Sequence, residues 1–363
     1  MMNVQEITIE WPAVSIIIVS LNGRKWLKGL LKSILASNYP HDKLEIVFVD
    51  NGSTDGSIGF VKEMIGDTLR LKMIQNPINV GWSPANNQGM RVAKGEIIVC
   101  LSNDMEVDPN CVKEIVKIMK ADKHIGVVQC NSLSLWDRRT SDSGMNYLDK
   151  FGYAYSYAPL EETFEVFFAE GMAFAIKREV IGKVGMLDDY YFMEYDDMDF
   201  SWRVRLAGYS VFFVPTAKVY HARGGTVGAT YFQRVKNVMW YTRNHLVTLI
   251  KNYELKNLLK LLPIVLAVEI MKILYLPLMK KNWKVAYAAL RGIFYVLKDF
   301  RIIFQKRMEV QRMRKISDKE IMKFMHPFNP RLLRLFLILQ AKGKRLVLSG
   351  KPPMNEVKVN EKN

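Results

Sequence analysis

Residues 95–108 read GEIIVCLSNDMEVD, and this stretch decides the fold. Residues 97–101 form an unbroken apolar run of strand-forming residues, which is typical of a central strand covered on both faces of its sheet. Polar side chains begin where the run ends, at Ser102, Asn103, Asp104 and Glu106. In an open α/β sheet the ligand crevice lies outside the carboxyl ends of the strands. The stretch therefore predicts an α/β fold with a binding site at residues 102–106.

Asp104 is the first candidate for chemistry in this stretch. A carboxylate on a strand-end turn can hold Mg²⁺ or Mn²⁺ through one or two oxygens and leave positions for water and phosphate. The alternative is a solvated turn that only ends the strand. The rest of the chain has to decide between the two.

The residues before this stretch repeat the same alternation. Apolar strand patterns at residues 14–21, 44–49 and 69–74 are separated by loops and by helical spacing, as at residues 26–35. This order predicts a parallel sheet with right-handed crossovers. No Gly-x-Gly-x-x-Gly and no Gly-Lys-Ser/Thr follows the first strands, which argues against a Rossmann dehydrogenase and a P-loop NTPase. Asp50, at a strand tip, could accept a hydrogen bond from a ribose or a base, or could only form an Asx turn.

The residues after the central strand continue as helix 111–119 and strand 125–130. Residues 131–165 lose this pattern and are rich in aromatic side chains, which favours a substrate loop or a surface elaboration. Residues 170–176 predict a strand and residues 178–185 a helix. Two further short strands are expected at 211–214 and 217–220.

A second group of acids lies at residues 188–199, where six of twelve residues are Asp or Glu. The negative charges of such a cluster repel one another unless a cation or a functional role compensates for the repulsion. Some of its members are expected to cap the helix that follows. His221 ends the last strand. A lone histidine there is more often structural, but a neutral imidazole beside a carboxylate-bound metal is a suitable additional ligand.

Charge divides the chain into two unlike parts. Residues 1–222 carry 23 Lys+Arg and 28 Asp+Glu, a net of −5, whereas residues 223–363 carry 29 and 8, a net of +21. This distribution favours an enzyme domain held against an anionic surface, either membrane or nucleic acid. Three cysteines without metal-ligand spacing indicate reduced thiols in a cytosolic compartment. Residues 1–11 lack the basic start and apolar run of a signal peptide.

Several motifs together resemble glycosyltransferase family 2, the inverting enzymes of the GT-A fold, in order and spacing. They are DNGSTDGS at 50–57, NVG at 79–81, NNQG at 86–89, LSND at 101–104, YDDMD at 195–199, and His221. The resemblance covers about residues 12–230 and is nearest to rhamnosyltransferase-like and galactofuranosyltransferase-like members. It implies a mostly parallel, Rossmann-like GT-A domain over 12–230 and a nucleoside-diphosphate sugar as donor.

The resemblance also implies roles for individual residues. The base would be Asp197, in a pair with Asp196, and a divalent cation (Mg²⁺ or Mn²⁺) would be held by Asp104 and His221. Donor contacts fall on Ser20, Asn22, Asp50, Asn86, Ser102 and Asn103, and acceptor contacts on Glu170 and Gly171. Two departures matter. Ser102 stands where many relatives have a first acid, which predicts weaker metal binding. The Gln-x-x-Arg-Trp motif of processive synthases is absent, which favours the addition of one or a few sugars.

The basic half is expected to form a helical extension at 231–310 and a partly disordered tail at 311–363. Residues 258–279 are apolar except for three charges and two prolines, so a spanning helix, an interfacial amphipathic helix, and a bundle or dimer contact all stay open. A lipid-linked or glycan acceptor at the cytoplasmic face of the cell membrane would suit this extension. The rival readings are a sugar nucleotidyltransferase and a nucleic-acid-binding protein. Nucleic acid is not expected as a partner, because Trp283, Tyr287 and Phe294 lie in helical apolar context.

Overall fold

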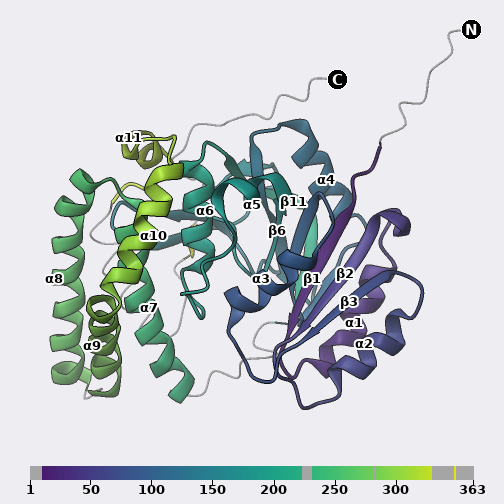
Figure 1. Cartoon of the computed structure of the whole chain (residues 1–363), viewed down its shortest axis with the longest axis horizontal. Coiled ribbons are helices and arrows are strands. Elements are labelled where there is room, and N and C mark those ends of the chain that lie inside the picture. Colours follow the sequence, from purple (N-terminus) through teal and green to yellow (C-terminus); the bar gives the residue numbers. More distant parts are fainter. Residues whose placement is uncertain (1–9, 223–230, 281–282, 329–346, 349–363) are drawn as a thin grey trace, which may run out of the picture.

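The computed structural model describes residues 10–222, 231–280, 283–328 and 347–348. Its centre is a mixed sheet with the strand order β3-β2-β1-β4-β10-β6-β11-β5, in which β9 also pairs with β11 (Figure 1). The predicted α/β fold is confirmed, and four of the eight strand pairings described in this sheet are parallel.

The first half of the sheet is parallel throughout. Its strands are β1 (Val14–Ser20), β2 (Leu44–Asp50), β3 (Arg70–Gln75) and β4 (Ile97–Ser102). Alternate side chains of each strand point to opposite faces. One face packs on α1 (Arg24–Leu35), α2 (Ser57–Ile65) and α4 (Cys111–Ala121), and the other on α3 (Trp82–Val92) and on the helices of the second half. A short 3-10 helix, His41–Lys43, precedes β2.

The second half carries strands of both directions. β6 (Ile125–Ser134) and β11 (Ser210–His221) are parallel, whereas β10 (Ala173–Lys177) and β5 (Met105–Val107) run antiparallel to their neighbours. The two strands expected at 211–214 and 217–220 form one strand, because the register only shifts at the bulge between Val214 and Lys218. The helices of this half are α5 (Arg178–Val184) and α6 (Asp196–Leu206).

The alternative of a surface elaboration at residues 131–165 is wrong, whereas a substrate role for this stretch stays a prediction. The stretch contains the end of β6, then β7 (Met145–Leu148), β8 (Ala154–Tyr157) and β9 (Phe164–Glu165), and β12 (Val347–Leu348) pairs with β8. Its aromatic side chains are the reason: Tyr147, Tyr153 and Tyr155 are buried in the core. Trp136 alone among the tryptophans and tyrosines of this stretch is largely exposed.

The C-terminal part is helical and lies against the side of the sheet that carries α6 (Figure 1). It consists of α7 (Tyr231–Asn252), α8 (Leu255–Lys280), α9 (Trp283–Lys298), α10 (Phe300–Met313) and α11 (Asp318–Ile321), followed by the 3-10 helix Met322–Phe324. Within the described residues no helix combines the length and the apolarity that a bilayer span requires. The predicted disorder of the tail falls on residues 329–346 and 349–363, outside the described part.

Candidate functional site

The loops after β1 and β2 are joined into one wall at the carboxyl end of the sheet. The Asn22 backbone N–H donates to Ser53 Oγ at 2.9 Å, and the Thr54 N–H donates to Asn22 Oδ1 at 2.9 Å. The Arg24 N–H donates to Asp55 Oδ2 at 2.8 Å. These reciprocal bonds fix the two loops relative to each other.

Asp50 lies in this wall with one unsatisfied oxygen. Its side chain is buried, and Oδ2 accepts a hydrogen bond from the Ser53 N–H at 3.2 Å. Oδ1 has no hydrogen-bond partner among the described residues. A buried acceptor without a partner costs free energy, roughly 1–3 kcal/mol. A ligand N–H or hydroxyl would therefore be stabilised at Asp50.

Ser20 and Asn103 connect the ends of β1 and β4. Asn103 Nδ2 donates to Ser20 Oγ at 2.9 Å, and both side chains are buried. Gly23 makes room for this bond, because a Cβ there would lie 1.9 Å from Asn103 Nδ2. Ser102 is half-buried beside them. Asn86 lies elsewhere, fully buried in α3 with Nδ2 donating to the Trp82 carbonyl at 3.0 Å.

His221 and Asp104 meet because β11 pairs with β5. The pairing sets His221 opposite Met105, and the Ala222 N–H donates to the Asp104 carbonyl at 2.9 Å. His221 Nε2 lies 3.4 Å from Asp104 Oδ1, and Nδ1 lies 2.5 Å from Asp142 Oδ2. Burial disfavours the imidazolium, but hydrogen bonds to the two carboxylates outweigh it and raise the pKa of His221 to about 9. Sequence reasoning missed Asp142, which has no local motif.

These side chains fit a divalent cation with two protein ligands. Among the residues that the structure describes, no group of three or more His, Cys, Asp or Glu is arranged to hold a metal. Asp104 and His221 nevertheless offer one carboxylate oxygen and one imidazole nitrogen close together. Asp142 can accept the Nδ1–H and so leave Nε2 as the ligand. Mg²⁺ commonly takes only one or two protein ligands and completes its shell with water and phosphate.

A pair of carboxyl groups occupies the start of α6. Asp197 Oδ2 accepts from the Gly171 N–H at 3.0 Å, and its Oδ1 accepts from the Met198 N–H at 2.8 Å. Asp196 accepts from Ser83 Oγ at 3.1 Å. Asp196 is buried, whereas Asp197 is half-buried and reaches the surface of the site.

The two carboxyl groups differ in acidity. Burial raises the pKa of Asp197 above its ordinary value, against the hydrogen bonds that it accepts. Burial and then the charge of Asp197 raise the pKa of Asp196 to about 8, and the same two causes raise that of Glu194 to about 7. Asp197 therefore ionises first. Near neutral pH it is the member of the pair that can accept a proton.

The other acids of residues 188–199 include two that are structural. Lys251 lies 2.5 Å from Asp188 Oδ2 and 2.9 Å from Asp199 Oδ1. Lys306 is bonded to Asp188, and Arg203 to Asp199. The compensating cations that the sequence required thus come from α6, α7 and α10.

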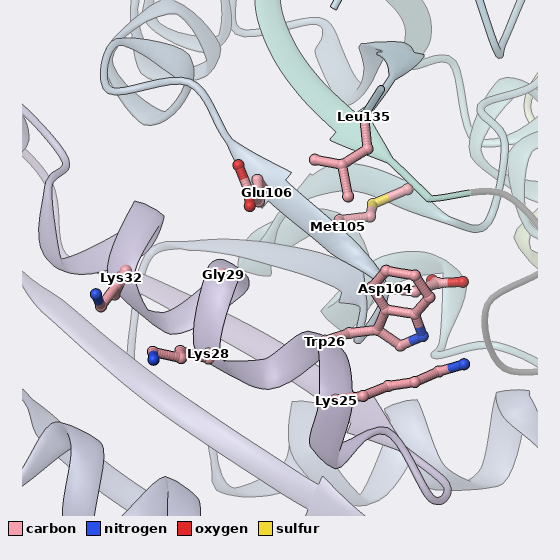
Figure 2. A pocket seen from close by; sticks show the side chains of 9 residues that line it. All are labelled: Lys25, Trp26, Lys28, Gly29, Lys32, Asp104, Met105, Glu106 and Leu135. Atoms are coloured by element: carbon pink, nitrogen blue, oxygen red, sulfur yellow. The ribbon is translucent and has the colours of Figure 1, made fainter. Parts of the chain in front are cut away.

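A cavity of about 380 Å³ opens beside Asp104, between α1 and β5 (Figure 2). Its volume is within the range of small-ligand pockets. Figure 2 shows three lysines from α1 on one side and Asp104, Met105 and Glu106 on the other. The lining residues are Lys25, Trp26, Lys28, Gly29, Lys32, Asp104, Met105, Glu106 and Leu135.

The predicted acceptor residues border the carboxyl pair at the start of α6. Glu170 is buried, and its N–H donates to Gln129 Oε1 at 3.3 Å. A Cβ on Gly171 would lie 3.5 Å from Trp82 Nε1 and 3.6 Å from Asp197 Oδ2. Gly171, Trp82 and Asp197 are therefore neighbours in the site. The acceptor role of Glu170 and Gly171 stays a prediction.

Comparison with known proteins places this geometry in a family. Residues 15–185 match the family model described as Glycosyl transferase family 2. Similar curated proteins include the poly-beta-1,6-N-acetyl-D-glucosamine synthase of Staphylococcus epidermidis, 23% identical over 65% of this chain and 55% of its own length. The probable glycosyltransferase YdaM of Bacillus subtilis is 27% identical over 66% of this chain and 57% of its own length. The chain thus spans little more than half the length of these relatives.

Solved structures share the fold at low sequence identity. The mannosyltransferase PcManGT of Pyrobaculum calidifontis, in complex with GDP-Man and Mn²⁺, has a TM-score of 0.51 and 22% identity over 83% of this chain and 86% of its own. The S. aureus TarS fragment 1–349 in complex with UDP-GlcNAc has a TM-score of 0.53 and 15% identity over 87% and 93%. The family match and the fold agree with the motif order along the chain. Residues 15–185 thus match glycosyltransferase family 2, and the chain has the GT-A fold.

Proposed function

We propose that the protein is an inverting, metal-dependent glycosyltransferase that transfers a sugar from a nucleoside-diphosphate sugar to a hydroxyl of a glycan or lipid-linked acceptor. The observation that carries the proposal is the Asp197 carboxylate, which is oriented by two backbone N–H groups at the edge of the site and has a raised pKa. A general base needs this combination of fixed position and tuned acidity.

The chemistry follows from where the residues lie. Asp197 would accept the proton of the acceptor hydroxyl as that oxygen attacks the anomeric carbon, and the bond to the nucleoside diphosphate breaks on the opposite face. One displacement inverts the anomer. Asp104 and His221 are the candidate ligands of a divalent cation, which would supply Lewis-acid stabilisation of the charge on the leaving diphosphate. The unsatisfied Asp50 oxygen would hold the nucleoside.

The donor class is supported by the fold neighbours, which were solved with GDP-Man or UDP-GlcNAc. We therefore expect a UDP-, dTDP- or GDP-linked sugar. A thermal-shift screen of these donors with Mn²⁺ tests binding, and product analysis with the matching donor tests the reaction. Release of nucleoside diphosphate and an inverted anomer in the product support the proposal. Release of pyrophosphate would instead identify a nucleotidyltransferase.

The acceptor side of the proposal includes a membrane surface. An exposed stripe runs along one side of α9, with its members between 52% and 70% exposed: Trp283, Tyr287, Leu290, Phe294 and Leu297. The opposite side of α9 is Ala- and Gly-rich and packs closely on α7, since a Cβ at Gly292 would lie 2.8 Å from the Met239 carbonyl. Exposed aromatic and aliphatic side chains among lysines and arginines are typical of an interfacial helix. We infer that this stripe holds the enzyme at the cytoplasmic face of an anionic membrane.

A further inference from the structure

Residues 190–195 lead into the proposed catalytic pair, and side chains of helix α7 hold this segment. Phe192 stacks on Trp240 with ring centroids 4.7 Å apart, and Tyr191 Oη lies 2.8 Å from Thr248 Oγ1. Tyr195 Oη donates to Tyr241 Oη at 3.0 Å. His245 also stacks on Tyr195, with ring centroids 5.2 Å apart. Four residues of one helix thus contact three residues in the run that leads into Asp196 and Asp197.

The backbone of this segment takes an uncommon conformation next to the base. Glu194 and Tyr195 both have φ of +67°, and Tyr195 is the residue that precedes α6. Left-handed φ is disfavoured for residues with a Cβ, and such residues persist when their surroundings fix them. The direction in which α6 and Asp197 enter the site depends on these two residues.

Asn244 supplies that fixation. Its side chain is fully buried, and Nδ2 donates to the Met193 carbonyl and to the Glu194 carbonyl, each at 2.8 Å. Its Oδ1 accepts from Arg243 Nε at 2.8 Å, and Arg243 Nη2 donates to the Tyr190 carbonyl at 3.0 Å. An apolar or shorter side chain at position 244 would leave two carbonyl groups without this donor.

We propose that Asn244 is the positioning residue of the catalytic base, so that helix α7 of the C-terminal extension is a working part of the active site and not only an attachment. The inference rests on the proposed function. Asn244 touches no reacting atom and acts through the backbone of residues 193–195. The donor wall at the ends of β1 and β2 is built by other contacts.

The test compares Asn244→Ala with Asn257→Ala in the full chain. Asn257 is the matched control, because its amide makes a comparable bond within the extension, to Asp318 Oδ2 at 2.8 Å. We expect Asn244→Ala to lower kcat about 10- to 100-fold with the KM for donor unchanged, since misplacement of a reacting group by about 1 Å can cost 10²-fold. Asn257→Ala should keep the wild-type kcat.

A rescue experiment separates positioning from loss of stability. Glycine takes a left-handed φ without steric cost, so Glu194→Gly should reduce the effect of Asn244→Ala on kcat in a double-mutant cycle. If Asn244→Ala does not fold, Arg243→Met removes the neighbouring donor to the Tyr190 carbonyl from a half-buried site, and a smaller fall in kcat is expected.

Wild-type kcat in a folded Asn244→Ala protein, or equal effects of the substitutions at 244 and 257, would overturn the inference. If Arg243→Met is measured in place of Asn244→Ala, an unchanged kcat would likewise overturn the inference. Failure of the proposed function looks different, because the wild-type enzyme itself would then release no nucleoside diphosphate from any donor.

Discussion

At the scale of single residues, the acids of the site differ in their surroundings. Asp197 is half-buried and accepts two backbone hydrogen bonds, Asp196 is buried beside Ser83, and Asp199 is neutralised by Lys251 and Arg203. The same carboxyl group is therefore found as the proposed base, as a neighbour with a raised pKa and as a member of an ion pair. Burial and nearby charge decide which is which.

Asp197→Asn should abolish transfer while donor binding persists. The amide keeps the size of the side chain but cannot accept the proton, and a positioned general base contributes about 10² to 10⁴ in rate. Initial rates together with a donor thermal shift measure both effects. Asp196→Asn is the control and should lose less, because Asp196 is buried beside Ser83 and burial and the charge of Asp197 raise its pKa. A rate for Asp197→Asn within about threefold of wild type would remove Asp197 from the role of base.

The rate should also depend on pH through Asp197. The base works only when ionised, and burial raises its pKa above the ordinary value of 3.8. We expect kcat to fall as pH falls through a midpoint above 3.8, and the same acid limb to persist in Asp196→Asn. A pH–rate profile of both proteins, restricted to pH values at which they stay folded, measures this. A flat acid limb in the wild type would contradict the assignment.

At the scale of elements, α7 supplies a positive charge to the buried acids of residues 188–199, which water would otherwise have to solvate. Lys251 is buried between Asp188 and Asp199, and Lys306 of α10 reaches Asp188. These lysines hold the pKa of Asp188 well below its ordinary value, against the effect of burial. A carboxyl group with a lowered folded-state pKa stabilises the fold above its unfolded pKa, and this stability is lost as pH falls through the folded-state pKa.

Lys251→Met should therefore destabilise the protein strongly. Removal of one partner of a buried ion pair leaves an uncompensated charge and costs about 3–5 kcal/mol. The free energy of unfolding from denaturant titration measures the loss. Lys323→Met is the matched control, because its pair with Glu320 is exposed and exposed pairs contribute about 0–1 kcal/mol. Equal losses for the two substitutions would show that the Lys251 network does not hold the segment.

At the scale of the whole molecule, the chain joins a mildly acidic catalytic half to a strongly basic helical half. The apolar stripe of α9 faces away from α7, and further exposed apolar residues lie on α8 and α10, among them Leu259, Leu274 and Phe304. Apolar area and positive charge on one part of the molecule favour a lipid surface with anionic headgroups.

Binding to anionic vesicles should weaken as salt rises but should not vanish. Each well-placed Lys or Arg contributes about 1 kcal/mol, which salt screens, whereas the apolar stripe resists salt. Sedimentation with phosphatidylserine vesicles measures both parts, and Leu290→Glu with Phe294→Glu should remove the salt-resistant part. Neutral vesicles are the control. If the protein does not bind anionic vesicles at low salt and elutes as a dimer, the stripe is instead a contact with a second copy of the chain.

The sequence by itself determined the fold class, the strands β1 to β4, β6 and β10, and the candidates Asp104, Asp197 and His221. Apolar runs, turn residues and motif order are local, so the chain displays them before it folds. It could not show that Asp142 contacts His221, that β5 pairs with β11, or that aromatic residues 147–155 belong to the core. Nor could it show that Lys251 and Asn244 serve an acidic segment distant in the chain. Those contacts join residues from separate elements, and only the path of the chain through the sheet and its helices brings them together.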